Sequence, residues 1–219
     1  MIEVTQIRKS YGKKKVLSDI TFQVKPGECV AIAGKNGCGK STLMQIMAGI
    51  LKPDGGELCY FGKKAAYKSS IFRRFCGYVP QDNPLMEELT VQDNLKLWGG
   101  SHNANTKELV AQFQLEDLLQ TEVSKLSGGM KRRLSIACAL VENPPFLLMD
   151  EPTTALDLYY KESIHQWMKT YQQKNGIILM TTHDESEIRN ADRCLFMDEG
   201  KVQELDAEDI LQKFAGMSE

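Results

Sequence analysis

Residues 34–42, GKNGCGKST, have the residue types and spacing of a phosphate-binding loop. Gly37 and Gly39 allow the backbone to curl so that successive N–H groups point inward, and a helix that begins near Lys40 adds its positive end. The Lys40 ammonium supplies a charge for the β and γ phosphates, and the Ser41 hydroxyl is a ligand for Mg²⁺. Because the loop follows an apolar strand and precedes an amphipathic helix, it predicts binding of a nucleoside triphosphate.

Polar residues also follow two later apolar runs. Asp150 and Glu151 end the run FLLMDE, and His183 ends the run GIILMTTH. At the carboxyl edge of a parallel sheet, where ligands bind, Asp150 is predicted to hold Mg²⁺ and Glu151 to orient or deprotonate the attacking water. His183 is predicted to donate a hydrogen bond to the γ-phosphate or near the attacking water. The alternative is a set of solvated or packed side chains, which is the expectation for His102 and His165.

The elements that must position these residues alternate between short strands and longer helices. The clearest strands are expected at 28–33, 146–150, 176–183 and 193–200, which favours a mostly parallel sheet with helices on both faces. Apolar and polar residues alternate over residues 1–28, as in antiparallel strands with one solvent-exposed face. Residues 81–142 carry helical spacing without strong strand signals, so an inserted helical layer is expected there.

Composition narrows the class of protein. The chain has 219 residues, 42% hydrophobic and 26% charged, with a net charge of −2, which argues against nucleic acid as its main partner. Its six cysteines show no metal-ligand spacing and are expected to be reduced, structural thiols. The N-terminus lacks a signal pattern, and no apolar run approaches the roughly 20 residues that span a bilayer. A soluble protein is expected, although it could work against a membrane.

Taken in order, the motifs resemble those of the nucleotide-binding domain of the ATP-binding cassette (ABC) family, from about residue 2 to residue 205. The resemblance implies the ABC ATPase fold: an α/β P-loop NTPase core with a mostly parallel sheet, an N-terminal antiparallel β subdomain and an inserted α-helical subdomain. Residues of about 1–80 and 143–219 would form the catalytic core, and about 81–142 the helical subdomain. The motifs are GKNGCGKST (34–42), Gln81 in GYVPQDN, LSGGM (126–130), FLLMDEP (146–152), TTALD (153–157) and TTHD (181–184).

The same resemblance implies an ATPase that uses ATP and Mg²⁺. It assigns catalytic roles to Glu151, His183, Gln81 and Lys40, and Mg²⁺ contacts to Ser41, Gln81 and Asp150. Tyr11 would stack on adenine, for which the alternative is a half-buried strand tyrosine. The implied nucleotide contacts are Tyr11, Asn36, Gly37, Cys38, Gly39, Lys40, Ser41, Thr42, Ser127, Gly128, Gly129 and Asp157.

LSGGM is expected to form a second anion site, because Ser127 caps a helix while Gly128 and Gly129 expose backbone N–H groups. In the family this site faces the γ-phosphate that a partner chain holds. The resemblance therefore implies a second ABC ATPase subunit, identical or different, arranged head to tail so that two ATP molecules are sandwiched. ATP binding would close this interface and hydrolysis would open it.

Three residues depart from the family pattern. Met130 stands where the family usually has Gln, which implies weaker or slower closure. Lys35 lies in the loop where Pro or a small residue is common. Cys38 takes a position usually held by a small residue, and it leads to the hypothesis that a thiol-alkylating reagent blocks ATP binding.

The resemblance also implies the partners. As a transporter motor the chain would dock on separate transmembrane permease subunits at the cytoplasmic face of the membrane, through a surface within residues 81–98. Leu85, Met86, Leu89 and Trp98 are candidates for that face, although Leu89 and Trp98 could instead pack the helical lobe. Exporter-type cassettes are favoured over sugar importers. The alternatives are a soluble ABC ATPase acting on ribosomes or nucleic acid, and a module that binds ATP without hydrolysing it. The transported substrate and the direction of transport stay open.

Overall fold

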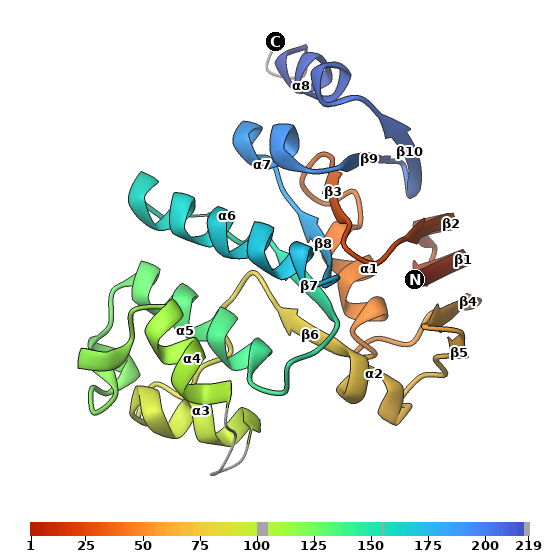
Figure 1. Ribbon diagram of the computed structural model, residues 1–219. Coiled ribbons are helices and arrows are strands. Elements are labelled where there is room, and N and C mark those ends of the chain that lie inside the picture. Colours follow the sequence, from red (N-terminus) through yellow and green to blue (C-terminus); the bar gives the residue numbers. More distant parts are fainter. Residues whose placement is uncertain (100–104, 155, 217–219) are drawn as a thin grey trace.

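The computed structural model (Figure 1) describes residues 1–99, 105–154 and 156–216, which form two sheets and the helices that pack against them. The strands are β1 (Ile2–Tyr11), β2 (Lys14–Val24), β3 (Cys29–Ala33), β4 (Gly55–Tyr60), β5 (Lys63–Lys64), β6 (Cys76–Val79), β7 (Phe146–Asp150), β8 (Ile177–Thr181), β9 (Arg193–Asp198) and β10 (Lys201–Leu205). The helices are α1 (Lys40–Met47), α2 (Ser70–Phe75), α3 (Val91–Gly99), α4 (Asn105–Gln112), α5 (Gly128–Leu140), α6 (Leu158–Gln173), α7 (Glu185–Asn190) and α8 (Ala207–Ala215), with 3₁₀ turns η1 (Glu116–Leu118) and η2 (Val123–Lys125).

The larger sheet carries the strand ends predicted to do chemistry. Its order is β10-β9-β3-β8-β7-β6. All neighbouring strands pair in parallel except that β10 runs antiparallel to β9. Every residue of β3, β7 and β8 is buried, as expected for strands covered on both faces. Thr181 pairs with Asp150 on one side and with Ile32 on the other. The carboxyl ends of these three strands therefore meet at one edge of the sheet.

The smaller sheet is antiparallel, in the order β2-β1-β4-β5. Its apolar residues alternate with exposed ones and face a core that also contains the buried side of α1. Leu43, Met44 and Met47 of α1 belong to the same core as Val30 and Ile32 of β3. Because α1 packs against both sheets, the loop that joins β3 to α1 has fixed ends.

The chain between β6 and β7 forms the helical layer. Its described residues contain α3, α4 and α5 and no sheet strand, and Figure 1 shows these helices gathered away from the antiparallel sheet. Their apolar faces share a core with Leu147 and Met149 of β7. The fold class expected from the sequence is confirmed, whereas the boundaries at about 81 and 142 stay a prediction. His102 lies outside the described residues.

The structure bears on two predictions from composition, one about the cysteines and one about membrane-spanning segments. All six cysteines are free thiols; Cys29, Cys138 and Cys194 are buried and the other three are partly buried. No helix within the described ranges is long and apolar enough to cross a membrane.

Candidate active site

The loop between β3 and α1 curls because two glycines adopt left-handed conformations. The angle φ is +77° at Gly37 and +116° at Gly39, a region that side chains disfavour. A Cβ at Gly39 would also lie 2.9 Å from Leu17 Cδ2. α1 begins directly after Gly39, and the Leu43 N–H donates to the Gly39 carbonyl at 3.0 Å. The positive end of α1 therefore points into the loop, which is the geometry of an anion cradle.

A cavity of about 400 Å³ opens beside this loop. Its wall combines the loop and the first turn of α1 with four residues from other parts of the chain. The lining residues are Val16, Asn36, Gly37, Gly39, Lys40, Ser41, Thr42, Gln81, Glu151 and His183. The predicted phosphate contacts and the predicted catalytic residues thus share one cavity.

Lys40 is buried at the floor of the cavity. Its ammonium donates to the Gly34 carbonyl at 2.8 Å and to the Lys35 carbonyl at 3.2 Å. Since an ammonium has three N–H donors, these two bonds hold it across the loop and leave a third donor for a phosphate oxygen. Lys40 is therefore a pre-positioned positive charge.

Glu151 is held in a strained backbone conformation at the end of β7. Its φ is +51°, a conformation that costs a non-glycine residue free energy and persists only where contacts with neighbours fix it. The Glu151 N–H donates to the Thr181 carbonyl at 3.1 Å and lies 3.1 Å from Thr181 Oγ1. With this backbone conformation Glu151 lines the cavity, whereas Asp150 beside it does not.

The Glu151 carboxylate joins the other predicted catalytic side chains. It accepts hydrogen bonds from Gln81 Nε2 at 3.3 Å and from Thr154 Oγ1 at 3.2 Å. His183 Nδ1 lies 3.5 Å from Glu151 Oε1. Gln81 follows β6, Glu151 follows β7 and His183 follows β8, so three neighbouring strands deliver one cluster. A carboxylate flanked by an amide and an imidazole can hold and deprotonate a water molecule.

Asp150 lies deeper in the protein than Glu151. It is buried, accepts a hydrogen bond from the Thr181 hydroxyl, and does not line the cavity. With the Ser41 hydroxyl and the Gln81 amide, it offers the oxygen ligands that Mg²⁺ prefers. The described residues contain no cluster of three or more His, Cys, Asp or Glu side chains that would cage a metal. These residues fit a Mg²⁺ that keeps several waters and takes its remaining ligands from a phosphate.

Several predicted nucleotide contacts lie outside this cavity. Ser127 caps α5, its hydroxyl accepting from the Met130 N–H at 3.3 Å, and Asp157 caps α6 by accepting from the Tyr160 N–H at 3.0 Å. Tyr11 is 51% exposed at the end of β1, with the Lys9 ammonium 5.7 Å from its ring; its stacking on adenine stays a prediction. The residues that do not line the cavity are Tyr11, Cys38, Ser127, Gly128, Gly129, Asp150 and Asp157. Ala155, within the TTALD segment, lies outside the described residues.

Comparison with known proteins decides the family. The family model described as "ABC transporter" matches residues 17–154. The Nod factor export ATP-binding protein I of Rhizobium etli is 35% identical over 98% of this chain and 71% of its own length.

The chain belongs to the ABC transporter family. It spans 61% of a second relative with the same name.

Solved structures agree with this assignment. A dimeric ATP-binding cassette, in a post-hydrolysis state bound to ADP and Pi, is 30% identical with a TM-score of 0.86, over 94% of this chain and 99% of that chain. A bacterial Atm1-family ABC exporter with ATP bound is 29% identical with a TM-score of 0.87, over 99% of this chain and 41% of that chain. The chain has the fold of an ABC ATPase cassette, and it is an ATPase of that family.

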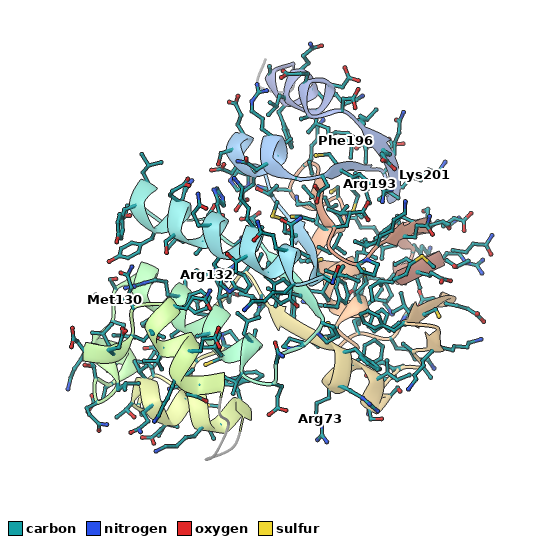
Figure 2. The ribbon with its side chains drawn as sticks, viewed as in Figure 1. Arg73, Met130, Arg132, Arg193, Phe196 and Lys201 are labelled. Carbon is teal, nitrogen blue, oxygen red and sulfur yellow. The ribbon has the colours of Figure 1, made fainter. Side chains whose placement is uncertain are left out.

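Arg132 of the cassette is a residue that the sequence reasoning missed. Figure 2 labels it on α5, two residues beyond Met130. The guanidinium is buried, and within the described part of the chain its hydrogen bonds all go to backbone carbonyls at the edge of the sheet that carries the active site. Its acceptors are the carbonyls of Pro152 at 3.0 Å, Asp150 at 2.7 Å, Glu151 at 2.9 Å, Pro80 and Gln81.

Arg132 therefore joins the helical layer to the residues that carry Gln81 and Glu151. Burial lowers the pKa of the guanidinium, and the negative charge of Asp150 opposes that shift. A sequence signal was present, because Arg132 is four residues before Ile136 and eight before Leu140, on the buried face of α5. A cation on an apolar helical face requires buried acceptors.

The rate at which the Cys38 thiol is alkylated is expected to depend on pH. Burial raises the pKa of its thiol, and the Lys40 ammonium lowers it only in part. Because the thiolate is the nucleophile, alkylation by iodoacetamide is expected to be slow at pH 7 and to accelerate about tenfold for each unit of rising pH. The measurement is mass spectrometry of the peptide that contains Cys38, with and without ATP.

We expect ATP to slow this modification and the modified protein to bind ATP weakly. Cys38→Ala is the control, in which ATP-sensitive labelling disappears. Fully alkylated protein that binds ATP with the parent affinity would refute the hypothesis that alkylation of Cys38 blocks ATP binding.

Proposed function

We propose that this ATPase hydrolyses ATP in the 400 Å³ cavity with Glu151 as the general base. The observation that carries the proposal is the cluster of Gln81, Glu151 and His183 beside the phosphate loop. The loop N–H groups and Lys40 would hold the phosphates, and Glu151 would take a proton from the attacking water. Gln81 and Thr154 hold the carboxylate in place, and His183 would donate to the γ-phosphate.

Ser41, Gln81 and Asp150 would hold Mg²⁺. A bound Mg²⁺ would neutralise charge on the β and γ phosphates. Asp150 is suited to this role through water, because its carboxylate is fixed by the Thr181 hydroxyl behind the cavity wall. The Ser41 hydroxyl lines the cavity directly.

The second half of each site would come from another cassette. Ser127 and Gly128 are exposed at the N-terminus of α5, away from the cavity of their own chain. The free N–H groups of that helix end would receive the γ-phosphate held by a partner. The similarity to a dimeric cassette supports this arrangement. Tyr11 would stack on adenine, and Asp157 would face the partner.

The membrane partner would dock in a second cavity. This groove, of about 590 Å³, lies between α2, the end of α3 and α5, and its wall includes Phe72, Tyr78, Pro84 and Trp98. Met86 and Trp98 are 56% and 48% exposed, whereas Leu85 packs against the core of the helical layer. We propose that a helix of a permease subunit binds here, at the cytoplasmic face of the membrane. Export is favoured, because the relatives above are named for export.

Ser41→Ala tests the assignment of the metal. The variant is expected to need roughly tenfold more Mg²⁺ for half-maximal hydrolysis, because one oxygen ligand is lost. Its affinity for ATP in EDTA should match the parent, and EDTA should abolish hydrolysis in both. Ser124→Ala, at an exposed serine of η2, is the matched control. An unchanged Mg²⁺ dependence in Ser41→Ala would remove Ser41 from the metal site.

A further inference from the structure

The residues on either side of His183, Thr182 and Asp184, are each connected to α6 through side-chain contacts. α6 packs beside β8, the strand that ends just before Thr182 (Figure 1). The His183 side chain itself is 59% exposed and reaches Glu151 across the cavity at 3.5 Å. Its position therefore depends on the backbone of residues 182–184 more than on packing of the ring.

The first tie runs from Lys161 to Asp184. The Lys161 ammonium donates to Asp184 Oδ2 at 2.6 Å. The other oxygen of Asp184 accepts from the N–H groups of Ser186 and Glu187 at 2.9 Å and 3.3 Å, which caps α7. Burial would raise the pKa of Asp184, but hydrogen bonds from Lys161 and Ser186 lower it well below its ordinary value. The carboxylate thus stays ionised and fixes the residue after His183.

The second tie runs from His165 to Glu187 and then to Thr182. His165 Nε2 and Glu187 Oε1 are 3.8 Å apart and both side chains are almost fully buried. At 3.8 Å the two atoms are in polar contact but not hydrogen-bonded, and neither has a hydrogen-bond partner among the described residues. Glu187 Oε2 accepts from the Thr182 hydroxyl, and Thr182 Oγ1 accepts from the Asp184 N–H at 2.9 Å. This chain of contacts fixes the residue before His183.

Lys161 and His165 are four residues apart, so they lie on one face of α6. We propose that α6 positions His183 by holding the residues on either side of it, Lys161 through Asp184 and His165 through Glu187. Neither pair touches the cavity that binds the nucleotide, so these are positioning residues. The inference rests on the proposed contact between His183 and the γ-phosphate.

The test is a double-mutant cycle in ATP hydrolysis. Lys161→Met is expected to lower kcat roughly tenfold with an unchanged KM for ATP, because misplacing a reacting group costs rate rather than binding. Lys161→Arg should restore kcat, since it keeps the ion pair. In a His183→Ala background, Lys161→Met should cause no further loss. Lys174→Met, which removes an exposed cation at the end of α6, is the control.

A second measurement serves if His183→Ala leaves too little activity for the cycle. Amide hydrogen exchange of Asp184, whose N–H donates to Thr182 Oγ1, should accelerate at least tenfold in Lys161→Met and not in Lys174→Met. Unchanged exchange would overturn the inference.

The outcomes separate the two proposals. If His183→Ala retains the parent kcat, the proposed role of His183 fails, and the inference fails with it. If His183→Ala loses activity but Lys161→Met lowers kcat equally in both backgrounds, the inference alone is overturned.

Discussion

Glu151→Gln is expected to lower kcat for ATP hydrolysis by roughly 10²- to 10⁴-fold, the range expected for loss of a general base. The amide of glutamine cannot accept the proton of the attacking water at neutral pH. Its carbonyl oxygen can still accept the hydrogen bonds from Gln81 and Thr154. The affinity for ATP should therefore stay within about twofold of the parent value.

Steady-state hydrolysis and equilibrium binding of a fluorescent ATP analogue measure the two quantities. Glu162→Gln is the matched control, because Glu162 is exposed on α6 and accepts a hydrogen bond from Gln166. The control should keep the parent rate. A Glu151→Gln protein that retains a substantial share of the parent rate would assign the base to another group.

Arg132→Met is expected to destabilise the fold by about 3 kcal/mol, because it removes the donor from two buried and three partly buried hydrogen bonds to carbonyls. For a chain of this size the midpoint of thermal unfolding should fall by about 10 °C. Activity should fall as well, since Arg132 holds the carbonyl of Glu151 at 2.9 Å. Arg132→Lys should recover only part of the stability, because an ammonium lacks the planar fork of a guanidinium.

Urea unfolding measures the change in stability. Lys125→Met, which removes a cation of the same helical layer that is 65% exposed, is the control. It should change the unfolding free energy by less than about 0.5 kcal/mol. Equal effects of the two substitutions would contradict the role of Arg132 as the link between the helical layer and the active site.

The sequence predicted the parts of the site that depend on local structure. A glycine-rich loop between a strand and a helix needs only its own residues, and Gly37 and Gly39 adopt the conformations that the motif requires. The strands that end at Asp150 and near His183 were recognisable because they are apolar up to their last residue. Parallel pairing then brings their carboxyl ends together.

Contacts between elements distant in the chain could not be predicted in this way. The five carbonyls around Arg132 belong to two segments far from α5 in sequence. The ties from Lys161 and His165 depend on how α6 lies beside α7. For Ser127 and Asp157, the single chain shows only their capping of α5 and α6, because the contacts proposed for them are with another chain.

LSGGM (126–130) is proposed to complete the site of a neighbouring cassette. The most direct measurement is the solution mass of Glu151→Gln with and without ATP and Mg²⁺. We expect ATP to double the 24.7 kDa mass. Adding Ser127→Arg should abolish the change, and adding Gln203→Arg, at an exposed residue of β10, should leave it intact. A protein that binds ATP and stays monomeric, or a dimer that tolerates Ser127→Arg, would contradict this proposal.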